Sequence, residues 1–428
     1  MTIYVVRPGD SVYAIARLFG VSMQTIIEDN ALSNPDVLVV GQALVIRTGT
    51  TATYRVAPGD TLYAIARSRG VSLTALIAAN PQITNPDLIY VGQVINIPVA
   101  PPPGRAIDVN GYVLPGISPN VLARTLPYLT FLSIFSYQAR PDGTLIPIND
   151  TPLITAARQA SVAPIMVITN IEEGNGFSSA LANTLLRDPQ AQQTLIDEIF
   201  RTLAQKGYMG LNIDFEYVYP EDGGAYDAFV QRMSELLHAR GYILTTALAP
   251  KLRAQQPGLL YEAHHYPVHG YFADHVILMT YEWGYTYGPP MAVSPIGPVS
   301  QVLDYAVTVI PAYKILMGMP NYGYDWTLPY RRGTAARNIS NTEAVELAAA
   351  RGAAIEFDAE AQAPFFYYYD SAGARHIVYF EDARSIQARL RLVDEYNLGG
   401  VSYWTINRFF PQNWLVLSSM YRIRKVTV

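Results

Sequence analysis

The sequence predicts an α/β fold: a (β/α)8 TIM barrel with a small α+β insertion after its seventh strand, preceded by two strand–helix–helix–strand domains. Three observations lead to this prediction. Apolar runs alternate with amphipathic stretches from residue 106 onward, which is typical of a parallel sheet covered by helices. Before that point, one unit of about 50 residues occurs twice. The chain has 428 residues, 50% of them hydrophobic, enough for a large core.

The composition excludes several classes of protein. The chain has no cysteine, which rules out a disulfide scaffold, cysteine-ligated zinc, an iron–sulfur cluster and a thiol nucleophile. Its formal net charge of −5 argues against a nucleic-acid partner. The 31 Tyr, 14 Phe and 4 Trp could stack on sugar rings, although core packing is the commoner role of any one ring.

The first residues lack the basic start and the long apolar run of a secretory signal. No stretch approaches the roughly 20 apolar residues that cross a bilayer. We therefore expect no membrane span, and a protein that stays inside the cell that makes it or leaves by a route not encoded at its N-terminus.

The internal repeat pairs YVVRPGDSVYAIARLFG at 4–20 with YRVAPGDTLYAIARSRG at 54–70. In the first copy, a Pro-Gly turn follows a short strand, and Asp10 or Ser11 caps a helix from about 12 to 19. A second helix stops near Asn30, and a strand over 43–46 closes the unit. The two units are expected at 2–48 and 53–98.

The opening Y-x-V-x-x-G-D-[ST], the central Asn and the final V-G-Q-x-L/I-x-I of each unit closely resemble the LysM domain. The resemblance implies binding of glycans that contain N-acetylglucosamine. The expected glycan-binding residues are Gly9, Asp10, Ser11, Gly59, Asp60 and Thr61. The alternative is that these residues only form the turn and cap the helix.

A Pro-rich linker over 99–105 leads into the expected barrel domain at 106–428. Eight strands are predicted at 107–113, 130–136, 162–169, 209–216, 243–249, 275–281, 315–320 and 399–404. Helices are predicted at 151–159, 190–205, 225–239, 297–309, 341–349 and 383–395. A doubly wound open sheet is the alternative, but no G-x-G-x-x-G follows the first strand.

The interval between the seventh and eighth strands is too long for one helix and predicts an antiparallel insertion at about 324–382. A hairpin turn is expected at 370–373. The run of aromatics just before this turn could wall a groove or simply pack the insertion.

The fourth strand ends with three alternating polar residues, Asn212, Asp214 and Glu216. Strand alternation places all three inside the barrel, at the end where barrel enzymes carry their catalytic groups. Two carboxyls in a desolvated site cannot both ionise cheaply, so one stays protonated near neutral pH. The sequence therefore predicts a general acid here, rather than a buried structural network.

This G-x-[DN]-x-D-x-E motif resembles the signature of glycoside hydrolase family 18, as do M-T-Y-E at 279–282, G-x-P-x-Y-G at 318–323 and Trp404 on the eighth strand. Asn212 and Glu282 depart from the family pattern, in which Asp is usual at both positions. The resemblance implies the catalytic residues Glu216, Asp214, Tyr281 and Asn212. The expected substrate-binding residues are Trp404, Glu282, Met279, Tyr322, Tyr112 and Trp283.

The family resemblance also implies a retaining, substrate-assisted mechanism. Glu216 would protonate the glycosidic oxygen while the 2-acetamido carbonyl of the substrate attacks the anomeric carbon. Asp214 and Tyr281 would hold the acetamido group above Trp404. The nucleophile then belongs to the substrate, so no cofactor and no metal are expected. His264, His265 and His269 lack a carboxylate at ligand spacing and are interpreted as hydrogen-bonded or exposed histidines.

Two LysM-like units ahead of such a barrel resemble the spore cortex-lytic enzymes of endospore-forming bacteria. This implies cleavage of cortex peptidoglycan, built from N-acetylglucosamine and muramic-δ-lactam, after N-acetylglucosamine. It also implies a spore protein made in the mother cell without a signal peptide. We expect a monomer. A chitinase, an endo-N-acetylglucosaminidase and a non-catalytic glycan-binding barrel are the alternatives.

Overall fold

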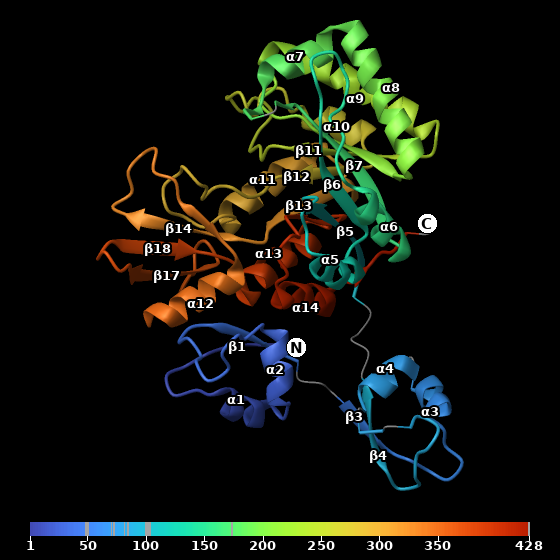
Figure 1. The fold of residues 1–428 in the computed structure, drawn as a ribbon, viewed down its shortest axis with the longest axis vertical. Helices are drawn as coiled ribbons and strands as arrows, with labels where there is room; N and C mark the ends of the chain where they lie inside the picture. The colour runs from blue at the N-terminus through green and yellow to red at the C-terminus, as the bar shows by residue number, and fades with distance from the viewer. Residues whose placement is uncertain are drawn as a thin grey trace.

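A computed structural model describes residues 1–47, 51–69, 71, 73–80, 82–83, 85–98, 104–172 and 174–426. Figure 1 shows a barrel domain, an insertion beside it and two small N-terminal units. Residues 99–103 of the predicted Pro-rich linker lie outside the described residues. None of the described helices is both long and apolar enough to cross a membrane.

Eight parallel strands close into the predicted barrel. They are β5 (Ala106–Val113), β6 (Phe131–Gln138), β7 (Ala163–Thr169), β10 (Gly210–Asp214), β11 (Ile243–Leu248), β12 (His275–Leu278), β13 (Ile315–Pro320) and β19 (Gly400–Trp404). Each strand pairs with its neighbour in chain order, and β19 pairs back to β5. The open-sheet alternative is therefore wrong.

Two strands end two or three residues earlier than predicted, β10 at Asp214 instead of 216 and β12 at Leu278 instead of 281. After Leu278 the chain turns on itself, because the Thr280 and Tyr281 amides bond to the carbonyls two residues before them. The motif residues Glu216 and Tyr281 therefore lie just beyond their strands, at the carboxyl mouth of the barrel.

Helices surround the barrel (Figure 1). They are α5 (Pro119–Thr125), α6 (Thr151–Gln159), α7 (Ser179–Arg187), α8 (Pro189–Lys206), α9 (Gly223–His238), α10 (Tyr266–Phe272), α11 (Ile296–Val309), α13 (Ala383–Glu395) and α14 (Pro411–Met420). The sequence prediction missed α5, α7, α10 and α14. All four are short, and three of them carry Pro in the first turn. Pro is common at the start of a helix, but in a sequence it also indicates that a helix is interrupted.

The insertion forms an antiparallel sheet in the order β15-β14-β18-β17-β16, with one helix against it. Its elements are β14 (Gly323–Leu328), β15 (Arg337–Ile339), α12 (Asn341–Arg351), β16 (Glu356–Asp358), β17 (Ala363–Tyr369) and β18 (Arg375–Tyr379). The predicted hairpin joins β17 to β18, and Gly373 has the left-handed φ of 81° that the turn needs.

The consecutive aromatics of β17 belong to the insertion itself. Phe366 and Tyr368 are buried in its core, and Tyr367 and Tyr369 point outward. This alternation is that of a half-buried strand. Of the two roles considered for these rings, packing of the insertion is the one that the structure shows.

Both N-terminal units have the predicted strand–helix–helix–strand order. The first contains β1 (Thr2–Val5), α1 (Val12–Phe19), α2 (Met23–Asp29) and β2 (Ala43–Ile46). The second contains β3 (Thr51–Arg55), α3 (Leu62–Ser68), α4 (Leu73–Ala78) and β4 (Val94–Pro98). Each unit has its own small core.

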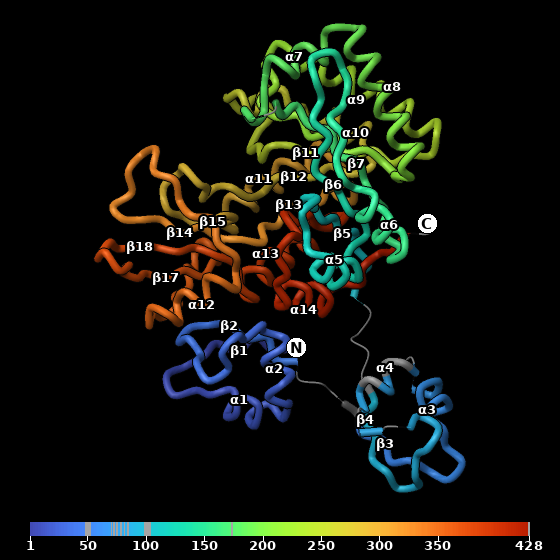
Figure 2. Tube along the Cα trace, viewed as in Figure 1, coloured from blue at the N-terminus to red at the C-terminus, as the bar shows by residue number. Residues whose placement is uncertain are grey.

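The first unit packs against the barrel domain, beside α12 and α14, as the chain trace in Figure 2 shows. The Ile355 amide donates to the Val40 carbonyl at 2.8 Å. Gly41 is required at this contact, because a Cβ there would lie 1.8 Å from the Ile355 carbonyl oxygen. The second unit has no hydrogen bond to the barrel domain among the described residues.

Candidate active site

The predicted polar triad occupies the carboxyl end of β10. Asn212 is fully buried, accepts a hydrogen bond from the Tyr112 hydroxyl at 3.0 Å and donates to the Thr245 hydroxyl at 2.8 Å. These contacts bridge β10 to β5 and β11 across the barrel interior. Asp214 is 4% exposed, and Glu216 is partly exposed. Asn212 and Asp214, the two buried residues of the triad, therefore lie inside the barrel, as the alternation of the strand predicts.

The surroundings favour a protonated acid. Burial raises the pKa of Asp214 to about 7. Burial also raises the pKa of Glu216 well above its ordinary value, and the nearby Asp214 and Glu282 carboxylates raise it further. Asp214 Oδ1 is buried without a hydrogen-bond partner among the described residues. The pair thus combines a proton donor with a free acceptor.

One asparagine holds the Glu216 backbone from both sides. Asn170, which directly follows β7, accepts from the Glu216 amide at 2.9 Å and donates to the Glu216 carbonyl at 2.8 Å. Its amide also donates to the Ser178 carbonyl at 3.0 Å. The sequence analysis missed Asn170, although its place at the end of a barrel strand was an available signal.

His264 supports the same loop from behind. Its Nδ1 accepts from the Ala249 amide at 2.9 Å, and Nε2 lies 2.9 Å from the Phe215 carbonyl oxygen. Acceptance at Nδ1 places the proton on Nε2, and burial lowers the pKa of His264 to about 4. Both ring nitrogens are therefore occupied, as expected for a hydrogen-bonded histidine, and no sequence signal indicated this contact.

Tyr281 and Glu282 enter the site from the loop after β12. Tyr281 is buried, and this burial raises the pKa of its hydroxyl. Glu282 adopts a left-handed φ of 66° and accepts hydrogen bonds from the hydroxyls of Tyr322 and Tyr324. Glu has a longer side chain than the Asp of the family motif. Here two tyrosines that follow β13 hold it by hydrogen bonds.

Trp404 forms an aromatic wall with two neighbours. Its ring lies 5.4 Å from Tyr112 and 4.8 Å from Phe135, edge to face in both pairs. The cleft beside it has a volume of about 540 Å³. The lining residues include Tyr112, Phe135, Phe177, Asp214, Glu216, Tyr217, Tyr261, Met279, Tyr281, Glu282, Tyr285 and Trp404. An adjoining cavity of about 340 Å³ shares Glu282 and Trp404.

Most of the site residues predicted in the barrel domain thus meet at one cleft, but not all. Asn212 lies beneath it, hydrogen-bonded to Tyr112, and Tyr322 lines the adjoining cavity. Trp283 lines neither and packs against the barrel core. Four further lining residues were missed: Tyr217 directly after the motif, Phe177 in the two-residue strand β9 (Gly176–Phe177), and Tyr261 and Tyr285 in loops without a motif.

In the N-terminal units the predicted glycan-binding residues make turn and cap contacts. Gly9 and Gly59 have left-handed φ values of 85° and 86°. Asp10 accepts from the Tyr4 hydroxyl, and Ser11 caps α1 through the Ala14 amide. Asp60 and Thr61 repeat these contacts with Tyr54 and Ala64. Their part in glycan binding stays a prediction.

Residues 128–408 match the family described as "Glycosyl hydrolases family 18", and residues 4–47 and 54–98 match the LysM domain. The chain is 46% identical over its whole length to the "Cortical fragment-lytic enzyme" of Bacillus subtilis, of which it also covers 100%. The structure is similar to the spore cortex-lytic enzyme SleL of Bacillus megaterium, with a TM-score of 0.84, 41% identity and 99% of each chain covered. A chitinase from Chromobacterium violaceum, 24% identical, shares the fold, with a TM-score of 0.68 over 74% of this chain and 99% of its own.

Proposed function

This chain belongs to glycosyl hydrolases family 18, and on that premise we propose that it is an N-acetylglucosaminidase that cleaves spore cortex peptidoglycan after N-acetylglucosamine. One observation carries the proposal: Glu216, with its raised pKa, lies in the cleft beside a buried Asp214 whose Oδ1 has no hydrogen-bond partner in the part of the chain that the structure describes. The relatives named for cortex lysis match over the full chain, which supports this choice of substrate.

The proposed reaction begins with the Glu216 proton, which passes to the glycosidic oxygen as the bond to the anomeric carbon breaks. The carbonyl oxygen of the substrate's own 2-acetamido group attacks that carbon and forms an oxazolinium ring. Asp214 Oδ1 accepts the acetamido N–H, and the Tyr281 hydroxyl donates to the acetamido oxygen. Trp404 supports the sugar ring from below.

In the second half, the Glu216 carboxylate removes a proton from water, which opens the oxazolinium ring from the same face that the leaving group occupied. The configuration at the anomeric carbon is therefore retained. Asn212 does not touch the substrate in this scheme. It fixes Tyr112, and thereby the aromatic wall that Tyr112 shares with Trp404.

Substrate assistance determines which bond can be cut. The nitrogen of muramic-δ-lactam is tied into a ring and offers no free acetamido arm. N-acetylglucosamine does offer one, so it must occupy the position above Trp404. In this proposal the LysM units hold the same glycan, and the protein works in the spore without a cofactor.

Glu216→Gln tests the proposal, because glutamine keeps the shape of the side chain but carries no transferable proton. We expect new reducing ends from cortex fragments to appear roughly 10²–10⁴-fold more slowly. Glu221→Gln, at an exposed residue five positions further on, is the matched control and should match the parent. Equal rates for Glu216→Gln and the parent would remove Glu216 as the acid.

The same assay separates the alternatives. A parent that degrades chitin well but releases no N-acetylglucosamine reducing ends from cortex fragments is a chitinase. A parent that binds N-acetylated glycans without any turnover is a glycan-binding barrel.

A further inference from the structure

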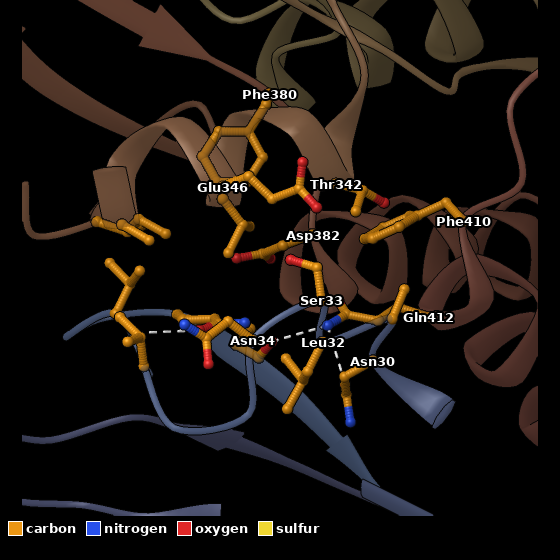
Figure 3. Close-up of a pocket in the computed structure, with 18 of the residues that line it drawn as sticks. Asn30, Leu32, Ser33, Asn34, Thr342, Glu346, Phe380, Asp382, Phe410 and Gln412 are labelled. Atoms are coloured by element: carbon orange, nitrogen blue, oxygen red, sulfur yellow. Dashed lines mark hydrogen bonds between the residues drawn. The ribbon is translucent and has the colours of Figure 1, made fainter. Parts of the chain in front are cut away.

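The insertion borders two cavities outside the catalytic cleft. One, of about 300 Å³, lies between the insertion and the first LysM unit, with Asn34 on one wall and Glu346 on the other (Figure 3). The other, of about 340 Å³, adjoins the cleft and shares Trp404 and Glu282 with it. A single glycan can occupy the cleft and this adjoining cavity together, so the residues of the adjoining cavity bear on which glycan is cut.

The place of Glu216 determines which end of the glycan enters the adjoining cavity. Glu216 lines the cleft but not the adjoining cavity. In the proposed reaction it protonates the oxygen of the bond that breaks, so that bond lies on the cleft side of the sugar above Trp404. The adjoining cavity therefore receives the next sugar toward the nonreducing end. Because the two sugars of peptidoglycan alternate, that sugar is a muramic residue whenever N-acetylglucosamine lies above Trp404.

The segment that follows β19 is fixed in place along this cavity. Asn321, 5% exposed, donates to the carbonyls of Thr405 and Arg408 at 3.1 and 2.8 Å. Asn407 exchanges two hydrogen bonds with the Leu114 backbone, at 2.8 and 3.0 Å. These bonds hold the segment before any ligand arrives, which lowers the entropic cost of binding.

Arg408 brings a positive charge to this segment. Within the part of the chain that the structure describes, it is the one Lys, Arg or His that lines the cleft or the adjoining cavity. Its Nη1 donates to the amide oxygen of Asn338 in the insertion at 3.0 Å. Arg408 forms no ion pair with the described residues. The remaining N–H groups of the guanidinium form a planar fork that matches a carboxylate.

The one carboxylate among the described residues that line the adjoining cavity is already hydrogen-bonded. Glu282 accepts from the hydroxyls of Tyr322 and Tyr324, and these donors stabilise its charge. The guanidinium of Arg408 is thus left to a ligand. An unpaired guanidinium in a substrate cavity favours a substrate that carries its own carboxylate.

We propose that Arg408 selects the muramic residue beside the cut by pairing with the carboxylate of its lactyl side chain. The inference rests on the proposed function and adds a specificity to it. N-acetylglucosamine has no lactyl group, and the lactyl carboxyl of muramic-δ-lactam is consumed in the ring amide. The protein therefore cuts fastest where the flanking muramic acid keeps a free carboxylate, and more slowly beside a lactam or in chitin.

A matched pair of substrates tests this inference. The first is the peptide-free tetrasaccharide that alternates N-acetylglucosamine and N-acetylmuramic acid and has N-acetylmuramic acid at its reducing end. In the second, the lactyl carboxylates are converted to primary amides, which keeps the shape and removes the charge. Initial rates of release of the trisaccharide that ends in N-acetylglucosamine give kcat/KM for the cut with muramic acid in the adjoining cavity.

The parent should favour the acid substrate over the amide. We expect Arg408→Gln to lower kcat/KM roughly tenfold on the acid substrate, because it removes charge-assisted hydrogen bonds, and by no more than about twofold on the amide. Arg408→Lys keeps the charge but not the planar fork, so it should keep part of the preference.

Arg332→Gln is the matched control, because it removes the same charge from an exposed position of the insertion that lines neither the cleft nor the adjoining cavity. It should keep the ratio of the two kcat/KM values that the parent has.

Three results would overturn the inference and leave the proposed function standing. They are equal losses of Arg408→Gln on both substrates, a parent that cuts both substrates equally well, and release of the terminal N-acetylglucosamine alone, which leaves the adjoining cavity empty. A parent that produces no N-acetylglucosamine reducing end from either substrate would count against the proposed function, and against this inference with it.

Discussion

At the scale of single residues, the two hydrogen bonds of Asn170 to the Glu216 backbone fix where the acid points. We predict that Asn170→Ala lowers the rate constant kcat by roughly 10–100-fold, because a displacement of about 1 Å can cost about 10²-fold in rate. Turnover of cortex fragments at saturating concentration measures this. Asn183→Ala is the control, because it removes a comparable bond to Asp222. Equal kcat values for the two variants would contradict the positioning role.

A second residue-level prediction concerns Asp214 and pH. Its folded-state pKa of about 7 lies above the ordinary value of 3.8, so folding favours the protonated form. The contribution of Asp214 to stability is therefore full below pH 4 and is lost as the pH rises through 7. Asp214→Asn cannot ionise. It should gain stability relative to the parent between pH 4 and pH 8, by at most about 4 kcal/mol.

Urea unfolding at the two pH values measures this gain. Asp142→Asn is the control, and its stability should change with pH in the opposite direction. Hydrogen bonds from Thr144 lower the pKa of the Asp142 carboxyl. That carboxylate stabilises the fold above its ordinary pKa, so its variant should lose rather than gain relative stability on going to pH 8. If the free energy of unfolding of Asp214→Asn differed from that of the parent by the same amount at both pH values, the raised pKa of Asp214 would be contradicted.

The sequence predicted some of these residues and not others. Asp214 and Glu216 belong to one strand end, where two-residue alternation and a continuous motif identify them. Asn170 and His264 reach the same loop from distant segments. The place of Asn170 directly after a barrel strand was a signal in the sequence, whereas His264 looks like an ordinary loop residue. The contacts that position the acid arise from chain closure, which no local pattern encodes.

At the scale of elements, barrel closure depends on the contact of β19 with β5. A Cβ at Gly400 would lie 1.8 Å from the Asp108 carbonyl oxygen, and backbone cannot give way as a side chain can. We predict that Gly400→Ala destabilises the barrel by about 3 kcal/mol or more, and lowers Tm by roughly 6 °C or more. Thermal unfolding measures the change.

Gly297→Ala is the control for this substitution, since a Cβ at Gly297 in α11 meets nothing within 4 Å. It should be neutral or slightly stabilising, because alanine is the better helix former. If Gly400→Ala had the same Tm as the parent, the close packing of β19 against β5 would be contradicted.

The strands were predictable because a buried parallel strand is a continuous apolar run bounded by turns. The closing pair is not visible in the sequence, because β5 and β19 lie some 290 residues apart. The helix predicted at 341–349 lies within the α+β insertion predicted at about 324–382, and it covers the insertion sheet. Its amphipathic pattern indicates a helix but does not say which sheet it covers.

At the scale of the whole molecule, Gln412 joins the first LysM unit to the barrel domain. We predict that Gln412→Ala speeds hydrogen exchange at the Ile355 amide, which donates across this interface to Val40, by roughly tenfold. Gln387→Ala should not change this exchange, because among the described residues the Gln387 side chain bonds to Arg391 alone. Unchanged exchange in Gln412→Ala would mean that the two domains are not joined there.

This docking could not be predicted from the repeat. The two LysM units share nearly the same sequence pattern, but among the described residues it is the first that forms hydrogen bonds with the barrel domain. Its contact residues, such as Gly41 and Val40, have counterparts in Gly92 and Val91 of the second unit, where Val91 is 65% exposed. Val39, which packs into the core of the insertion, has Tyr90 as its counterpart in the second unit.

The most direct test of the central claim is the identity of the sugar at the new reducing end. Cortex fragments digested with the parent protein are reduced with borohydride and analysed by mass spectrometry. The proposed chemistry predicts reduced N-acetylglucosamine at every new end, because muramic-δ-lactam has no free acetamido group to act as the nucleophile. New ends that carry a muramic acid derivative would contradict the account.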